Sequence, residues 1–306
     1  MESTLKNADM TLGAAIFTLC LCALFGGNGV AIKLGLTGLS PFTSAGIRFS
    51  MAVCFLLLWV WYQKIPLIPG PGQWQPVLIQ SLFFTVQVSL FHLGLFRTTA
   101  SHGALISNAL PFMVLILAHL FIPGDRITVK KSAGIVLGFM GVLVLFFDAP
   151  DLKTDLRSGD LFMLAAVLCW AMSAVYLKRI ISGFHPVQIT LLPMIFSIPF
   201  IFAGAFFWDH PMVTQVTPTV VGALLFQAVV TTSFGFVAWN SLLKRFGATV
   251  LHSFIFVMPI SGVFFGVMIL DEPLTGHLLI SIGFIVAGIL VVNVRKRKKL
   301  PPFPIQ

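Results

Sequence analysis

The sequence predicts an all-α membrane protein of ten transmembrane helices, arranged as two inverted five-helix repeats with both chain ends in the cytoplasm. Three observations lead to this prediction. Of the 306 residues 58% are hydrophobic and only 9% are charged, too few charges to cover a water-exposed surface. The charged residues separate apolar runs of about 18 to 24 residues, which match the thickness of a bilayer. The second half of the chain also repeats features of the first.

The apolar runs predict ten spans in chain order. These spans are 12–33, 43–62, 76–96, 100–122, 130–147, 159–180, 186–207, 218–242, 247–270 and 275–294. All four cysteines, Cys20, Cys22, Cys54 and Cys169, fall inside spans, where cysteine behaves as a small apolar residue. They form neither a disulfide framework nor a metal motif. We therefore expect no metal and no cofactor.

The basic residues predict the orientation in the membrane. If the N-terminus is cytoplasmic, 14 of the 19 lysines and arginines fall on the cytoplasmic side and four on the other side, with Arg48 inside a span. Cytoplasmic flanks carry the excess of basic residues in membrane proteins. The net charge of +9 is then explained by contact with an anionic lipid surface and requires no nucleic-acid partner. The basic tail, 295–306, is interpreted as a stop and anchor signal.

An internal repeat divides the chain into two halves at a shift of about 145 to 148 residues. The features matched in the same order are Lys33 to Pro41 with Lys178 to Pro186, Ala100 and Pro111 with Ala248 and Pro259, Asp125 to Thr128 with Glu272 to Thr275, and Gly141 with Gly288. Because each half holds an odd number of spans, the two halves enter the membrane from opposite sides. We expect a first repeat over 1–147, an extracytoplasmic linker over 148–158 and a second repeat over 159–294.

Inverted repeats place a ligand site near the membrane midplane, between the halves. The ten acidic residues all lie at span ends or in loops, so we expect no proton relay through a mid-membrane carboxylate. Arg48 is the basic residue that lies several positions into a span. It either attracts a substrate carboxylate or has a structural role, reaching the headgroups or bonding helix carbonyls.

Other polar and aromatic side chains are candidates for the lining of a substrate cavity. They are Asn28, Gln80, Gln87, His92, Asn108, Trp170, Tyr176, Gln227, Trp239 and His252. Gln80 and Gln87 are seven residues apart and share a helix face, which must meet protein or water rather than lipid. Cavity lining and hydrogen bonding between helices both satisfy that requirement. The matched Pro111 and Pro259 are candidates for hinges, or for packing kinks.

The many aromatic residues and the scarcity of buried charge predict an apolar pocket with a few polar anchors. Such a pocket favours a neutral, zwitterionic or amphiphilic ligand over a phosphate ester. Gly134 and Gly138 form a small-residue face on the fifth span. This face packs either within the chain or between two chains. Alone it is weak evidence for a dimer, so a monomer is expected and a homodimer is the alternative.

Several of these residues stand in the pattern of a known family. The motifs are Phe25 to Lys33 followed by Pro41 and Arg48, Ala238 to Asn240 followed by Gly247 and Ala248, and Pro259 followed by Leu270 to Thr275. On these motifs the chain resembles, from about 12 to 294, the drug/metabolite transporter superfamily and within it the EamA-type ten-helix exporters. The resemblance implies a multi-pass permease of the bacterial inner membrane that exports amino acids, other metabolites or toxic compounds.

We therefore expect a secondary transporter that works by alternating access on a small-molecule substrate, most consistent with efflux of amino acids or related compounds. A nucleotide-sugar or triose-phosphate exchanger of the same superfamily is the alternative, and it would carry several basic residues in its cavity. A channel shares the helices but does not need an inverted repeat. An enzyme is not expected, because the sequence holds no zinc-protease, nucleophile-elbow or phosphate-loop motif.

Overall fold

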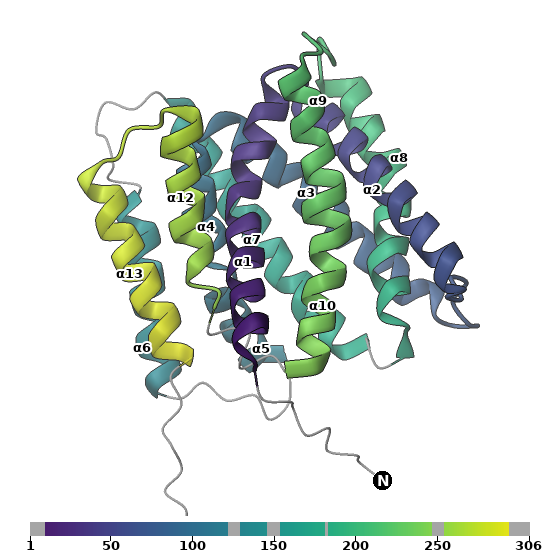
Figure 1. Ribbon diagram of the computed structural model, residues 1–306, viewed down its shortest axis with the longest axis horizontal. Helices are drawn as coiled ribbons and strands as arrows, with labels where there is room; N and C mark the ends of the chain where they lie inside the picture. The colour runs from purple at the N-terminus through teal and green to yellow at the C-terminus, as the bar shows by residue number, and fades with distance from the viewer. Residues whose placement is uncertain (1–9, 122–128, 146–153, 181–182, 247–253, 294–306) are drawn as a thin grey trace, which may run out of the picture.

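The computed structural model describes residues 10–121, 129–145, 154–180, 183–246 and 254–293, in which the helices form one bundle (Figure 1). The helices of the first half are α1 Leu12–Leu36, α2 Pro41–Gln63, α3 Trp74–Arg97, α4 Ala100–Ser107, α5 Leu110–Phe121 and α6 Val129–Leu145. Those of the second half are α7 Thr154–Ile180, α8 Pro186–Trp208, α9 Pro218–Leu225, the π-helix η2 Phe226–Phe234, α10 Gly235–Phe246, α12 Val257–Leu270 and α13 Gly276–Asn293.

The described helices confirm the predicted all-α membrane fold. Seven described segments are long and apolar enough to cross a membrane, with α4 and α5 counted as one segment and the chain from α9 into α10 as another. Two further helices, α12 and α13, are shorter and apolar. In lipid, a helix bonds its own backbone polar groups, which is why apolar runs of this length become helices.

Threonine and proline fix where several helices begin. The hydroxyls of Thr11, Thr99 and Thr217 accept hydrogen bonds from the first turns of α1, α4 and α9. A short polar side chain at this position satisfies backbone N–H groups that have no partner inside the helix. Pro41 opens α2, where the missing N–H of proline has no cost.

The packing of helices has the symmetry that two inverted repeats require. α1 of the first half packs against α12 of the second, and α7 of the second half packs against α4 and α5 of the first. Likewise α3 packs against α7, and α9 packs against α1. The helices α2 and α8 pack against each other, as do α6 and α13. Exchanging the two halves maps α1–α12 onto α7 with α4 and α5, maps α3–α7 onto α9–α1, and leaves α2–α8 and α6–α13 unchanged. The two halves are therefore packed into each other throughout the bundle.

A glycine contact holds α6 against α13, two helices that lie side by side at one edge of the bundle (Figure 1). A Cβ atom added at Gly288 would lie 2.7 Å from the carbonyl oxygen of Gly134, and one added at Gly134 would lie 2.8 Å from that of Gly288. Gly138 packs against the ring of Phe112. The small-residue face on the fifth span is therefore used within the chain.

Both matched prolines lie in the first turn of a helix that follows an interruption. α4 ends at Ser107 and α5 begins at Leu110, one residue before Pro111. In the second half a turn at 254–256 precedes α12, whose third residue is Pro259. The expected single helix over 100–122 is thus two helices, because a proline cannot donate the hydrogen bond that would continue the helix across the break. The start of the ninth predicted span, 247–253, lies outside the described residues.

Candidate functional site

Polar side chains from α1, α2, α3 and η2 lie close together inside the bundle. This group, which we name the polar centre, consists of Asn28, Ser44, Arg48, His92, Gln227, Thr231 and Thr232. Three of the helices belong to the first half and η2 belongs to the second. The polar centre therefore lies between the repeats, where inverted-repeat transporters bind their ligands.

Arg48 is the charged residue of the polar centre and is only 7% exposed. Its Nη2 donates a hydrogen bond of 3.1 Å to Thr232 Oγ1, and its guanidinium carbon lies 5.0 Å from the centroid of the Phe49 ring. Its Nε has no hydrogen-bond partner within the described ranges. The side chain is buried and does not extend to the headgroups. A buried cation that is only partly bonded is costly in a membrane, and such residues mark functional sites.

His92 presents a free acceptor to the same region. Its Nδ1 lies 3.0 Å from the carbonyl oxygen of Val88. A carbonyl can only accept, so Nδ1 holds the proton and the neutral ring leaves Nε2 as a lone-pair acceptor. Nε2 is buried and has no partner among the described residues. The His92 ring centroid lies 6.5 Å from that of Phe49, the ring that Arg48 also contacts.

The π-helix η2 connects α1 and α2 through successive residues. Thr231 Oγ1 donates to Asn28 Oδ1 on α1 at 2.9 Å, and Thr232 Oγ1 accepts from Arg48 on α2. One turn earlier, Gln227 Nε2 donates 2.8 Å to the carbonyl oxygen of Ala31. π-helical segments are rare and occur frequently at functional sites. Sequence reasoning found Asn28, Arg48 and Gln227 but did not single out Thr232 or the π-helix.

Gly35 marks the end of the polar centre nearest to the α1–α2 connection. A Cβ atom at this position would lie 3.3 Å from Gln227 Nε2 and 3.4 Å from Ser44 Oγ. Ser44 Oγ and Gln227 Oε1 are both buried without a hydrogen-bond partner in the described part of the chain. Together with Arg48 and His92, they give the polar centre both donors and acceptors that the other described residues do not saturate.

Other predicted site residues lie between α3 and α7. Gln80 Nε2 donates a hydrogen bond of 2.8 Å to Ser173 Oγ, and the Tyr176 ring centroid lies 5.9 Å from that of Phe83. Gln87 on α3 and Trp170 on α7 are half-buried. Gln80 is thus engaged in bonding between helices, one of the two roles that its position allowed.

The remaining predicted residues are spread over other elements. Asn108 lies at the break between α4 and α5, where its Nδ2 donates to the carbonyl oxygen of Ala104. Trp239 on α10 packs its ring 6.1 Å from Phe25 on α1. His252 lies outside the described residues. Over the described ranges, no group of three or more His, Cys, Asp and Glu side chains is arranged to hold a metal.

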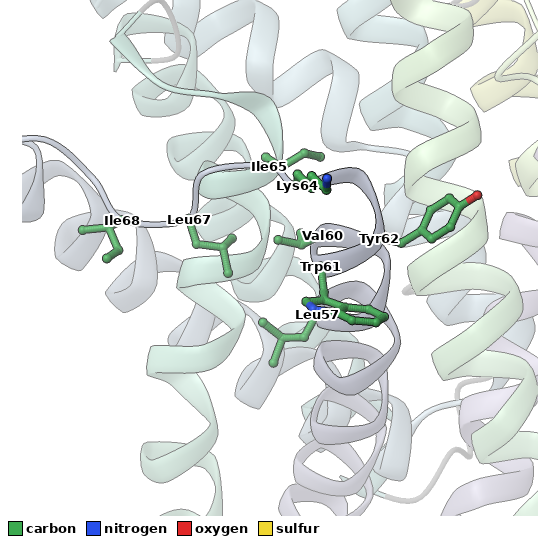
Figure 2. Close-up of a pocket in the computed structure, with 8 residues that line it drawn as sticks. All are labelled: Leu57, Val60, Trp61, Tyr62, Lys64, Ile65, Leu67 and Ile68. Atoms are coloured by element: carbon green, nitrogen blue, oxygen red, sulfur yellow. The ribbon is translucent and has the colours of Figure 1, made fainter.

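A surface hollow at the end of α2 is lined mainly by apolar side chains and does not include the polar centre (Figure 2). Its lining residues are Leu57, Val60, Trp61, Tyr62, Lys64, Ile65, Leu67 and Ile68. Trp61 and Tyr62 are 77% and 74% exposed. Exposed tryptophan and tyrosine beside a lysine are typical of the membrane–water interface. We therefore assign this hollow to the lipid-facing surface.

Three carboxylates of the second half bond to the first half at one end of the bundle. Asp209 accepts hydrogen bonds from the N–H and hydroxyl of Thr43, at 2.6 and 2.8 Å. Glu272 accepts from the N–H groups of Ala100 and Ser101, at 2.5 and 2.8 Å. Asp160 accepts from the Thr98 hydroxyl, and its other oxygen lies 3.0 Å from Nδ1 of His102. On the predicted orientation this end is extracytoplasmic, so we name these bonds the outer contacts.

Comparison with known proteins gives matches over nearly the whole chain. The sequence matches the EamA-like transporter family over residues 12–147 and again over 157–294. A probable amino-acid metabolite efflux pump of Escherichia coli (strain K12) is 29% identical over 290 residues, covering 91% of this chain and 94% of that protein. The uncharacterized transporter YyaM of Bacillus subtilis (strain 168) is 26% identical over 293 residues, covering 93% of this chain and 92% of that protein.

The fold also has a counterpart among solved structures. A crystal structure with 15% sequence identity superposes with a TM-score of 0.66, covering 92% of this chain and 97% of the other. At that identity the likeness concerns the fold alone. It carries no information about a ligand.

Proposed function

The chain belongs to the EamA-like transporter family, and from that premise we propose that it exports amino acids or closely related zwitterionic metabolites by alternating access. The family match confirms the resemblance found in the sequence. With the apolar helices, it also confirms a multi-pass membrane protein that is a transporter and not an enzyme. Two relatives, from Escherichia coli and Salmonella typhimurium, are named probable amino-acid metabolite efflux pumps, which supports this choice of substrate.

The observation that carries the proposal is the incompletely bonded polar centre between the two halves. Within the described parts of the chain, the buried Arg48 has an Nε donor without a partner, and His92 and Gln227 of the same group have acceptors without partners. A protein that needed this region only for stability would gain by saturating these groups or replacing them with apolar residues. Polar groups left without partners are instead available to a ligand that enters when the bundle opens.

The outer contacts indicate how the proposed carrier changes state. They join Asp160, Asp209 and Glu272 of the second half to α2, the α3–α4 corner and α4 of the first. Opening the polar centre to the outside by rocking one half against the other requires these bonds to break. In the described structure they are formed, so we propose that this conformation is closed on the outer side.

The alternative substrate class, sugar phosphates and nucleotide sugars, is disfavoured by charge. A phosphate ester carries more negative charge than one guanidinium balances, and exchangers of such compounds need several cations in the site. Within the described residues, the polar centre holds the single cation Arg48. A zwitterion, which carries no net charge, fits this balance better.

Counterflow in liposomes tests the proposal. Purified protein is reconstituted into vesicles loaded with either pooled standard L-amino acids or pooled sugar phosphates, and uptake of the matching radiolabelled compounds is measured. We expect saturable uptake that requires internal amino acids. Uptake that depends on internal sugar phosphates alone would contradict the substrate class, and non-saturable flux without internal substrate would indicate a channel.

A further inference from the structure

We propose that Arg48 and His92 bind the two charged ends of one α-amino acid, the carboxylate at Arg48 and the ammonium group at His92 Nε2. The inference rests on the proposed function and makes it specific. It assigns a separate role to each residue and states which chemical group of the substrate each one requires.

Arg48 has the donors that a carboxylate accepts. Its Nη2 is bonded to Thr232, whereas its Nε, which points along one edge of the planar guanidinium, has no partner among the described residues. A guanidinium presents N–H donors in a fixed fork that matches a carboxylate, and such charged pairs are among the stronger hydrogen bonds. The three outer-contact carboxylates bond to Thr43, Thr98, Ala100 and Ser101 instead. No carboxylate of the described residues pairs with Arg48, so we assign its negative partner to the ligand.

His92 has the acceptor that an ammonium group needs. The Val88 carbonyl requires a proton on Nδ1, so in the neutral ring Nε2 can accept but not donate. At 2% exposure the ring is buried, and an unfilled acceptor in such a place loses the hydrogen bond that water would give it. A carboxylate cannot fill it, because a carboxylate also only accepts. An N–H donor is required, and the ammonium group of an amino acid has three.

Arg48 and His92 both lie near the ring of Phe49. The guanidinium carbon of Arg48 lies 5.0 Å from its centroid, and the His92 ring centroid lies 6.5 Å from it. An α-amino acid carries its carboxylate and ammonium on one carbon, and we infer that its two ends reach these two groups, which lie near the same ring. Phe84, edge-on to Phe49 at 5.1 Å, extends the apolar wall beside them. An aliphatic or aromatic substrate side chain can pack against that wall.

The arrangement predicts discrimination against molecules that lack either end. A decarboxylated amine leaves the Arg48 donor unfilled, and a deaminated acid leaves the His92 acceptor unfilled. Leaving a buried charged or polar group unpaired weakens binding by about tenfold or more. The two losses of binding are independent. Removing Arg48 should therefore abolish only the discrimination against the amine, and removing His92 only the discrimination against the deaminated acid.

Competition in proteoliposomes tests this assignment. Vesicles containing the full-length protein are loaded with pooled standard L-amino acids, and each radiolabelled L-amino acid is offered outside. For one that is transported, its own decarboxylated amine and deaminated acid are then used as competitors. For leucine these are isoamylamine and 4-methylpentanoate. We expect both analogues to compete about tenfold or more weakly than the amino acid.

Variants separate the two roles. Arg48→Gln should lose the preference for the amino acid over the amine, and His92→Leu should lose the preference over the deaminated acid. Arg97→Gln and His119→Leu are matched controls, because Arg97 also contacts a phenylalanine ring but is exposed, and His119 is an exposed helical histidine. Both controls should retain both preferences. Gel filtration of each variant measures folded yield.

The outcomes distinguish this assignment from the proposed function. If no amino acid is transported, the proposed function fails and the assignment fails with it. If amino acids are transported but both analogues compete as well as the amino acid, only the assignment is overturned, and wild-type protein alone shows this. The assignment would also be overturned if Arg48→Gln and His92→Leu weakened the amino acid and both analogues equally. The preference for the amino acid over each analogue would then be the same as in the wild type.

Discussion

Thr232 contacts the Arg48 guanidinium through one hydrogen bond of 3.1 Å, so its role in transport can be tested by removing that bond alone. Thr232→Val keeps the shape of the side chain and removes that acceptor. A hydrogen bond to a charged group contributes about 1.5–3 kcal/mol, so we expect the initial rate of counterflow per folded molecule to fall by about tenfold or more. Reconstituted protein of matched yield provides the measurement.

The adjacent Thr231 provides the comparison. Its hydroxyl bonds to the neutral amide of Asn28, and a neutral hydrogen bond contributes only about 1 kcal/mol. Thr231→Val should therefore reduce the rate less than Thr232→Val. If both variants lose transport equally, the charge of Arg48 is not what makes this position important.

Asp209, just beyond the end of α8, predicts a pH dependence of stability. Burial raises the pKa of its carboxyl above the ordinary value, against the hydrogen bonds from Thr43 that lower it. A raised pKa in the folded state means that the folded protein holds this proton at a pH where the unfolded chain has released it. The contribution to stability is therefore full below the unfolded pKa and is lost as pH rises through the folded pKa.

Asp209→Asn should remove this contribution while Asn keeps an acceptor for Thr43. We expect the difference in melting temperature between Asp209→Asn and wild type to increase as pH rises from the ordinary pKa of aspartate toward neutrality. Asp271→Asn, at an exposed position, serves as control. A difference that stays constant, or that shrinks with rising pH, would contradict the assigned direction.

Some residues of the polar centre could be predicted from the sequence and others could not. Arg48 stands out because a charge inside an apolar run requires an explanation, and Asn28, His92 and Gln227 stand out as amide and imidazole groups in lipid. Thr232 does not, since a threonine in a span ordinarily bonds to its own helix, as Thr231 also does at the carbonyl of Gln227. Only the structure shows which threonine faces the guanidinium.

At the scale of helices, the contact of α6 with α13 predicts different effects for two glycines of one helix. A Cβ atom at Gly288 would meet the backbone of α6, at 2.7 Å from the oxygen of Gly134 and 2.9 Å from the nitrogen of Gly138. Backbone atoms cannot move aside cheaply, and overpacking of this kind costs about 1–3 kcal/mol. Gly288→Ala should therefore lower the melting temperature and the folded yield.

Gly283 lies on the same helix and has no atom within 4 Å of the corresponding position. Gly283→Ala should leave stability unchanged or raise it by up to about 1 kcal/mol, because alanine is the better helix former. Thermal melts of the two variants in one detergent compare them directly. Equal destabilisation would show that helix contact at Gly288 is not the cause.

The positions of the helices could be predicted from apolar runs, but their interruptions could not. Ten predicted spans correspond to helical segments of the described chain, since run length and bilayer thickness determine them together. The break before Pro111 and the π-helix Phe226–Phe234 have no hydropathy signal. Both are changes in which backbone carbonyl accepts from a given N–H group, and hydropathy depends only on the side chains.

At the scale of the whole molecule, the outer contacts predict that the charge of Glu272 stabilises the state closed to the outside. Glu272→Gln weakens charge-assisted bonds to the N-terminus of α4 and should favour outward opening. A reporter is provided by Ser44→Cys in a background without the four native cysteines, because Ser44 is buried one turn from Arg48. We expect faster labelling of this cysteine by a membrane-impermeant thiol reagent from outside.

Asp271→Asn is the matched control for this experiment. Asp271 is exposed next to Glu272 and has a left-handed backbone conformation that asparagine tolerates. It should leave the labelling rate unchanged. Slower or equal labelling in Glu272→Gln would mean that the carboxylate does not hold the outer side closed.

The domain division predicted from the sequence follows from the matched features of the two halves, and the packing explains why these features recur. The main helix contacts between the halves have counterparts with the halves exchanged, so both halves meet similar neighbours. The ligand could not be predicted in the same way, because the repeat determines the arrangement of helices and not which side chains of the polar centre stay unpaired. Transport of amino acids therefore remains a proposal, supported by the charge of the polar centre.

The most direct test of alternating access is whether a reagent in water can reach the polar centre from both sides of the membrane, one side at a time. The cysteine of Ser44→Cys is exposed to an impermeant thiol reagent applied first outside and then inside sealed vesicles, with and without the transported amino acid. Alternating access through the polar centre predicts labelling from each side and slower labelling when the amino acid is bound. Labelling from neither side, or labelling that the amino acid does not affect, would contradict the claim that this centre is the substrate site of an alternating-access carrier.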